Sequence, residues 1–452
     1  MKTVKNFFIV TAVLSLVMSA VSASASAQTK VITLEQAIGI ALDENASVRI
    51  ADMDIEKTGY ARKGSYAALY PQIDGSASYQ RTIKKQVMYM DFDMGTDYGS
   101  DYSSSDGFEV GRWNAFSAGV SASLPLVNAQ LWESLKISDS DVELAVEKAR
   151  GSRLSMVTQV KNAYYAVLLA KQAFDVYKSV YENALENLEQ TRRKYNAQRA
   201  SELDLTRAKT SYANAIPNVY DAENSVVLAL WRLKAVMGVD LQEDIDVAGS
   251  LDDYAAEMAA GVSPDGEYDL TRNSTMRQLA IQAEELANTV KLQKYANIPT
   301  LALAFNYSII ANTNDFVFSE YKWSPYSYVG LSLNIPIFAG GKRSNAVKQA
   351  RVQADELALT QADTERQLRI SIRQYLGTMD TQMRSLDSAK SAVESAQKAY
   401  DIARKSYNVG RSTLTDLNDS QLALVQAQLS VSQAIYSFEV AKASLEEILG
   451  NE

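Results

Sequence analysis

The chain has no cysteine and no histidine among its 452 residues. Without cysteine it can form no disulfide, no thiolate metal site and no lipidated N-terminal cysteine. Without histidine it lacks the commonest general base and the commonest transition-metal ligand. The remaining residues form no recognisable catalytic constellation. We therefore predict that the protein is not an enzyme and that it carries no metal and no cofactor.

Long apolar runs and an excess of positive charge are also missing. No run after the start of the chain reaches the roughly 18 residues that a membrane-spanning helix needs. The formal net charge of −9 argues against nucleic acid as a partner. At the start, Lys2 and Lys5 precede a short apolar run that leads to small residues ending at Ala27, a pattern typical of a secretory signal peptide. We expect residues 1–27 to be removed on export.

The sequence contains one helical unit twice. Residues 195–238 align without a gap with residues 407–450. Identical pairs include Tyr195/Tyr407, Asn196/Asn408, Arg199/Arg411, Asp204/Asp416, Leu205/Leu417 and Gly238/Gly450. Both copies carry apolar residues at heptad spacing, which is the seam of a coiled coil. These positions are Leu417, Leu424, Val431, Phe438 and Leu445 in the second copy, and Leu205, Tyr212, Val219, Val226 and Leu233 in the first. The pattern predicts a tandem duplication of long helices.

Each copy also contains two segments in which apolar and polar residues alternate. This period of two predicts strands with unlike faces. The predicted strands lie at about 72–79, 115–126, 300–310 and 328–337. Proline suits the junctions between helices and strands, because it interrupts both a helix and a central ladder. The junction prolines are Pro71, Pro125, Pro299 and Pro336.

The order of these segments predicts the domain organisation. A first repeat of helix, two strands and a helix hairpin covers residues 28–238, and a second covers 273–452. Between them, residues 239–272 are acidic and lack periodicity, so we interpret them as an equatorial connector with one short strand. Residues 128–195 contain no proline and predict one helix of about 100 Å. Pro217 falls inside the returning helix and is expected to bend it.

Two strands per repeat have a consequence for assembly. Four strands cannot close a barrel, and open sheet edges are not tolerated in lipid. Apolar strand faces in an exported chain therefore predict a barrel that several chains share. The predicted fold class is a mixed α/β membrane protein, composed mostly of long α-helical coiled-coil hairpins with four antiparallel strands per chain.

The segment YNVGRSTLTDLNDSQ at residues 407–421, the duplication and the proline-bounded strand pairs resemble the TolC-like outer-membrane efflux proteins. The resemblance covers about residues 32–450. It implies a homotrimer with a twelve-stranded transmembrane β-barrel, continued by a twelve-helix tunnel across the periplasm of a bacterial cell. It implies a passive outer-membrane channel of a tripartite efflux or type I secretion system. The implied partners are a periplasmic adaptor, an inner-membrane transporter and outer-membrane lipid.

The resemblance also implies site residues at the two helix–turn–helix tips. The implied adaptor-docking residues are Val409, Gly410, Arg411, Ser412 and Thr413, with Ala197, Gln198, Arg199 and Ser201 in the first copy. The implied periplasmic aperture residues are Asp416, Asp419, Asp204 and Tyr407, with Arg404 and Arg411 as counter-charges. Because Ala197 and Gln198 replace Val-Gly, we expect the first turn to use a different geometry and its docking surface to be weaker or differently selective.

Other interpretations remain open at this stage. The chain could be a periplasmic coiled-coil scaffold or the adaptor itself, without channel activity. A scaffold does not need four alternating strands, and an adaptor would show one helix hairpin flanked by β-rich halves. Without the resemblance, the tip residues would be ordinary solvated helix ends.

Overall fold

The computed structural model describes residues 30–89, 107–258 and 268–451, so the predicted signal peptide lies outside the described residues. The chain divides into two compact units. Unit 1 comprises Met1–Ile55, Ala145–Leu279 and Thr360–Glu452, and unit 2 comprises Glu56–Leu144 and Ala280–Leu359. Each unit takes segments from both sequence repeats, so the compact units do not correspond to the repeats.

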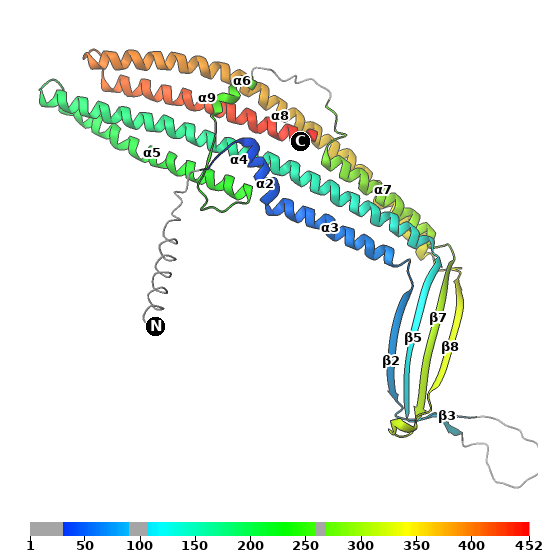
Figure 1. The fold of residues 1–452 in the computed structure, drawn as a ribbon. Helices are drawn as coiled ribbons and strands as arrows, with labels where there is room; N and C mark the ends of the chain where they lie inside the picture. The colour runs from blue at the N-terminus through cyan, green and yellow to red at the C-terminus, as the bar shows by residue number, and fades with distance from the viewer. Residues whose placement is uncertain (1–29, 90–106, 259–267, 452) are drawn as a thin grey trace, which may run out of the picture. The chain divides into compact units, whose positions relative to one another are not determined.

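Unit 2 contains a four-stranded antiparallel sheet (Figure 1). Its strands are β2 (Gln72–Arg81), β5 (Asn114–Val127), β7 (Thr300–Thr313) and β8 (Ser324–Asn334), in the order β2-β5-β7-β8. A smaller antiparallel pair, β3 (Gln86–Met88) with β4 (Phe108–Val110), and the 3-10 turn η2 (Phe318–Glu320) lie beyond one end of the strands. The duplicated strand pairs therefore form one continuous sheet.

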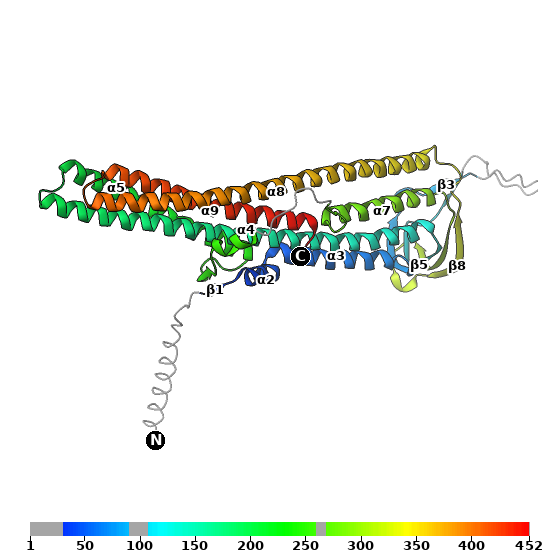
Figure 2. The ribbon, with the colours of Figure 1, turned by 90° about the horizontal axis from the view of Figure 1, so that it is seen from above.

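Long helices make up most of the rest of the described chain. They are α3 (Ala46–Ala67), α4 (Ala129–Asn196), α5 (Glu202–Met237), α7 (Ser274–Tyr295), α8 (Lys342–Asn408) and α9 (Leu414–Leu449). Helix α4 has 68 residues and α8 has 67, which corresponds to about 100 Å each. In unit 1, α4 turns into α5 and α8 turns into α9, and both turns lie at the same end of the unit (Figure 2).

The predicted heptad positions are mostly buried in α9, whereas in α5 all of them except Leu233 are half-buried. Helix α9 buries Leu417, Leu424, Phe438 and Leu445 along one face. Helix α5 buries alanine at three positions, Ala208, Ala215 and Ala222, and larger side chains only near its end, at Leu233, Lys234 and Met237. Alanine at a helix contact lets the neighbouring helix approach closely, while large side chains fill the space beside it.

Short elements surround the middle of the hairpins. They are β1 (Lys30–Ile32), α2 (Leu34–Glu44), β6 (Ile245–Val247), η1 (Leu251–Tyr254) and α6 (Ala255–Met258). The connector strand β6 pairs in parallel with β1. The Tyr164 hydroxyl of α4 lies 2.6 Å from the carbonyl oxygen of Ala248 and 3.1 Å from that of Ile32. Burial raises the pKa of Tyr164 to about 12, so this residue remains a neutral hydrogen-bond donor.

An asparagine joins the start of α7 to the end of α9. The side-chain oxygen of Asn273 accepts from the backbone N–H of Met276 at 2.9 Å, as an N-cap residue does. Its amide nitrogen donates to the carbonyl oxygen of Ile448 at 2.7 Å. Gly450 ends α9 with φ 70°, and a Cβ there would lie 2.2 Å from the carbonyl oxygen of Arg272. Only glycine fits this close approach.

The first repeat contains the equivalent joint. Asn45 accepts from the N–H of Ser47 at 2.7 Å and donates to the carbonyl oxygen of Val236 at 2.7 Å. Gly238 ends α5 with φ 77°, and a Cβ there would approach Asn45 to 3.0 Å. The duplication therefore preserves a helix-end joint, in which each asparagine caps one helix and binds the last turn of another.

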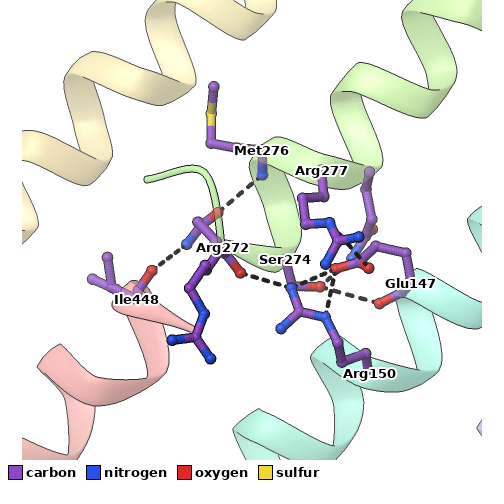
Figure 3. A network of polar contacts seen from close by, with 9 residues as sticks. Glu147, Arg150, Arg272, Ser274, Met276, Arg277 and Ile448 are labelled. Atoms are coloured by element: carbon purple, nitrogen blue, oxygen red, sulfur yellow. Dashed lines mark hydrogen bonds and ion pairs between the residues drawn. The ribbon is translucent and has the colours of Figure 1, made fainter. Parts of the chain in front are cut away.

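A buried carboxylate reinforces the second joint (Figure 3). Glu147 on α4 is 6% exposed, and its Oε1 lies 2.7 Å from the Nη2 of Arg150. The same Nη2 donates to the carbonyl oxygen of Arg272 at 2.7 Å, and Arg277 lies 3.6 Å from the other carboxylate oxygen. The Ser274 hydroxyl donates to the backbone carbonyl of Glu147. Removing one partner of such a buried pair is costly, because the other charge is left without compensation.

The predicted fold class is confirmed, with a mostly helical chain and four antiparallel strands. One strand boundary differs from the sequence predictions. Strand β8 starts at Ser324, before the predicted residue 328, because β7 continues to Thr313 and its Ile310 pairs with Ser324. Helix α5 continues through Pro217 without a break, and the bend expected there stays a prediction. In the described part of the chain, no helix combines the length and the apolarity needed to cross a membrane.

Candidate functional site

The four-stranded sheet has one apolar and one polar face. The register places Leu303 between Leu124 and Leu331, and side chains two residues apart share a face. The apolar face carries Ile73, Tyr79, Phe116, Val120, Leu124, Leu301, Leu303, Phe305, Tyr307, Val329, Leu331 and Leu333. The polar face carries Gln72, Asp74, Ser76, Ser78, Ser117, Ser121, Ser123, Asn306, Ser308, Ser332 and Asn334. Leu331 is 67% exposed in the single chain. A sheet of this kind fits a position in which its apolar face meets lipid and its polar face meets water.

Aromatic rings gather at the end of the sheet where β2 finishes. Tyr79 stacks on Phe116 with ring centroids 4.8 Å apart. Phe318 and Tyr321 lie 5.5 Å and 5.4 Å from the Phe116 ring. Aromatic residues at the border of an apolar strand surface are typical of a membrane interface.

The two helix–turn–helix tips have the same backbone. Gly410 has φ 76° and Gln198 has φ 58°. The N–H of Arg411 donates to the Ser406 carbonyl at 2.8 Å. In the first copy, the N–H of Arg199 donates to the Lys194 carbonyl at 2.7 Å. The prediction of a different geometry for the first turn is therefore wrong, because the same local backbone hydrogen bonds close both turns and Gln198 adopts the left-handed conformation that glycine adopts readily.

Each tip is followed by a capping box that uses a predicted aperture aspartate. Asp416 accepts hydrogen bonds from the Thr413 N–H at 2.9 Å, the Thr413 hydroxyl at 2.7 Å and the Ser412 hydroxyl at 3.0 Å. These hydrogen bonds lower the pKa of the Asp416 carboxyl, and the bond from the Thr413 N–H contributes most. Asp204 forms the same box with Ser201. Both aspartates are exposed or half-exposed, and each fixes the start of the returning helix.

Tyr407 lies at the contact between the two hairpins. It is 8% exposed, and its hydroxyl lies 2.7 Å from the Thr191 hydroxyl of α4. Lys194 lies 4.7 Å from the centre of the Tyr407 ring and also donates to its carbonyl oxygen. These contacts bring the two tips together. Arg404 pairs with Glu186 at 2.8 Å and is not a counter-charge to the predicted aperture aspartates within this chain.

Asp419 lies apart from the capping boxes. It is exposed on α9 and lines a groove of about 580 Å³ between α9 and the α4–α5 hairpin. Arg207, Asn214, Asn418 and Leu422 line the same groove. The remaining predicted docking residues, Ala197, Arg199, Val409 and Arg411, are exposed at the tips, and Val409 is 69% exposed.

The four junction prolines occupy different positions. Pro71 and Pro299 directly precede β2 and β7, and Pro336 follows the end of β8. Pro125 lies inside β5, close to its end and within the predicted strand, next to a register irregularity between Pro125 and Val127. A bulge accommodates proline because the local ladder is already interrupted.

Two features of the site were not predicted from the sequence. The contacts of Thr191 and Lys194 with Tyr407 join helices from different repeats. The only indication of these contacts in the sequence is Thr191, a polar residue on an otherwise apolar heptad seam. The positive φ of Gln198 could have been found from its alignment with Gly410. In the described part of the chain, no group of acidic residues is arranged to hold a metal ion.

A sheet with two unlike faces and paired long helix hairpins define the fold class of this chain. The family model for outer membrane efflux proteins matches residues 37–239 and 269–451, so this chain belongs to that family. The family places the chain at the bacterial outer membrane.

Relatives and solved structures agree with this assignment. The chain is 21% identical over 241 residues to outer membrane protein TolC of Vibrio cholerae, which covers 52% of this chain and 53% of the relative. It is 22% identical over 328 residues to the probable efflux pump outer membrane protein TtgC of Pseudomonas putida, covering 71% of this chain and 63% of the relative. It thus matches about half to two thirds of the length of these curated relatives.

The fold is that of solved outer membrane channels. The CmeC outer membrane channel of Campylobacter jejuni superposes with a TM-score of 0.71 at 19% identity, covering 92% of this chain and 85% of CmeC. At this identity the likeness establishes the fold.

Proposed function

We propose that this chain is one protomer of a homotrimeric outer-membrane channel. Three copies of the four-stranded sheet form a twelve-stranded barrel, and the helices continue it as a tunnel through the periplasm. The channel conducts substrates passively and belongs to a tripartite efflux or type I secretion system.

The single observation that carries this proposal is the sheet with two unlike faces and two edge strands. Strands β2 and β8 each have one neighbour in the described sheet. An exposed edge and an apolar face are stable in a bilayer only when the edge is paired and the face meets lipid. Pairing β8 of one protomer with β2 of the next satisfies both requirements, and it keeps all neighbouring strands antiparallel around the ring.

The helix hairpins support the tunnel. Helices of about 100 Å exceed the usual helix length several-fold and suit a conduit that crosses an aqueous compartment. Their distal turns present exposed Val409 and Arg411 in one hairpin and exposed Gln198 and Arg199 in the other. We propose that these tips dock a periplasmic adaptor, which connects the channel to an inner-membrane transporter.

We further propose that Asp416, Asp419, Asp204 and Tyr407 surround the periplasmic aperture. Three copies of each carboxylate around one axis favour cation entry. The capping boxes hold Asp416 and Asp204 at fixed positions relative to the turns. Tyr407 packs between the hairpins, so a change in their separation would alter its contacts.

Conductance of the purified protein in a planar bilayer, together with its mass in detergent, tests this function. The proposal predicts a trimer that forms discrete, cation-preferring channels. Replacing Asp419 by alanine should lower the cation preference or the block by multivalent cations. A protein that is monomeric or dimeric and never forms channels would contradict the proposal and favour the scaffold.

A further inference from the structure

One ionisable side chain stands alone on the polar face of the sheet. Across the four described strands, the register assigns to that face serine, threonine, asparagine, glutamine, glycine, alanine, proline, isoleucine and tyrosine, and a single charged residue, Asp74. Two of the hydroxyls, those of Ser78 and Ser117, lie 2.7 Å apart. The face is therefore wettable, and its fixed charge comes from one carboxylate per chain.

The neighbours of Asp74 along its row are neutral. Asp74 is paired with Ser121 on β5, Ser121 with Asn306 on β7, and Asn306 with Tyr328 on β8. The row nearer the helices begins with Gln72 and Ser123 and is also uncharged. Because β2 is exposed along its whole length in the single chain, the Asp74 side chain is open to solvent on this face.

We propose that Asp74 determines the cation preference of the barrel part of the pore. This inference rests on the proposed function, because the polar face lines a pore only in the closed trimer. The three Asp74 carboxylates then form one acidic ring at a single height. Rings of carboxylates attract hydrated inorganic cations and cationic organic substrates, and they repel anions. The hydroxyl and amide groups around the ring solvate either kind of ion.

The size of the effect depends on salt. A unit charge about 10 Å from an ion in water changes the local ion concentration by roughly two-fold, and three such charges act together. The Debye length is about 30 Å at 0.01 M salt and about 3 Å at 1 M. We therefore expect Asp74 to contribute to the cation preference in dilute salt, and we expect this contribution to be lost in concentrated salt.

The test uses reversal potentials of the full trimer in potassium chloride gradients applied in both directions. Asp74→Asn removes the charge and keeps the shape. Asp74→Asn combined with Ser121→Asp returns one carboxylate to the cross-strand neighbour on the same face. In one direction of the gradient, the dilute compartment, at about 0.01 M, lies on the side that the pore reaches through the Arg81 end of the strands. In that direction, Asp74→Asn should lower the ratio of potassium to chloride permeability roughly two-fold or more. The double variant should restore it.

The outcomes separate this inference from the proposed function. If the wild-type protein forms trimeric channels and Asp74→Asn leaves the permeability ratio unchanged in dilute salt, Asp74 does not set the preference. A loss that Ser121→Asp fails to restore would also contradict the inference, because it would show an effect of side-chain shape instead of charge. If the wild-type protein forms no channels at all, the proposed function itself fails.

Discussion

Replacing Asn273 by alanine removes two hydrogen bonds that join the ends of α7 and α9. The side chain is 4% exposed, accepts from the Met276 N–H and donates to the Ile448 carbonyl. Loss of the N-cap bond costs about 0.5–2 kcal/mol. Leaving the partly buried Ile448 carbonyl without its donor costs a further 1–3 kcal/mol or so. We expect the joint to lose about 2–4 kcal/mol of stability against local opening.

Amide hydrogen exchange of the purified protein measures this loss at the joint itself. Local opening is the relevant equilibrium, because helix ends exchange through sub-global opening and not through complete unfolding. A loss of about 2–4 kcal/mol corresponds to exchange that is roughly 30- to 1,000-fold faster in the first turn of α7 and the last turn of α9. Asn45→Ala is the matched control, because it should accelerate exchange at the ends of α3 and α5 and leave α7 and α9 unchanged.

A second variant separates the two hydrogen bonds. Asn273→Asp keeps an oxygen that can accept from the Met276 N–H, but it places a carboxylate against the Ile448 carbonyl. We expect this variant to accelerate exchange in the last turn of α9 at least as much as Asn273→Ala does. Exchange at wild-type rates in Asn273→Asp would refute the reasoning, since it would show that Asn273 acts only as an N-cap.

Three further predictions concern single positions. Gln198→Gly should slow amide exchange around the first tip, and Gly410→Gln should speed amide exchange around the second, because a non-glycine residue in the left-handed region costs about 1 kcal/mol. Exchange at wild-type rates in both variants would contradict this. The lowered pKa of Asp416 means that its contribution to the start of α9 is present above the ordinary carboxyl pKa and is lost as the pH falls through the depressed value. Exchange in the first turn of α9, corrected for intrinsic pH dependence, should rise in acid, and this rise should vanish in Asp416→Asn. Gly450→Ala should strongly reduce the yield of folded protein, because its Cβ would collide with a backbone oxygen; normal yield and melting behaviour would argue against that collision.

The long elements could be predicted from the sequence because their signals are local and repeated. The absence of proline over residues 128–195 and the heptads of α9 predict the hairpins, and α4 indeed spans Ala129–Asn196. Alternation predicts the strands and their unlike faces. The caps at Asn45 and Asn273 also follow from a small polar residue that precedes a helical pattern.

The remaining features depend on contacts between distant segments. Arg404 pairs with Glu186, a residue of the other repeat, so its partner could not be read from spacing along α8. The position of Asp74 among neutral neighbours follows only from the strand register, since a shift by one residue would move its side chain to the other face.

The central claim is that β8 of one protomer pairs with β2 of the next in a ring of three. The absence of cysteine allows a direct test, because engineered thiols are then the only ones present. Ser76→Cys on β2 would be combined in turn with Tyr326→Cys, Tyr328→Cys, Gly330→Cys and Ser332→Cys on β8. After oxidation in the membrane, denaturing gels would show which products are covalent.

The account predicts that at least one of these cysteine pairs gives a covalent ladder that stops at three chains, while each single-cysteine variant gives none. The ladder stops there because a heterologous contact that closes by rotation forms a ring of fixed size. Monomers alone from every pair, or products that continue beyond three chains, would contradict the shared barrel.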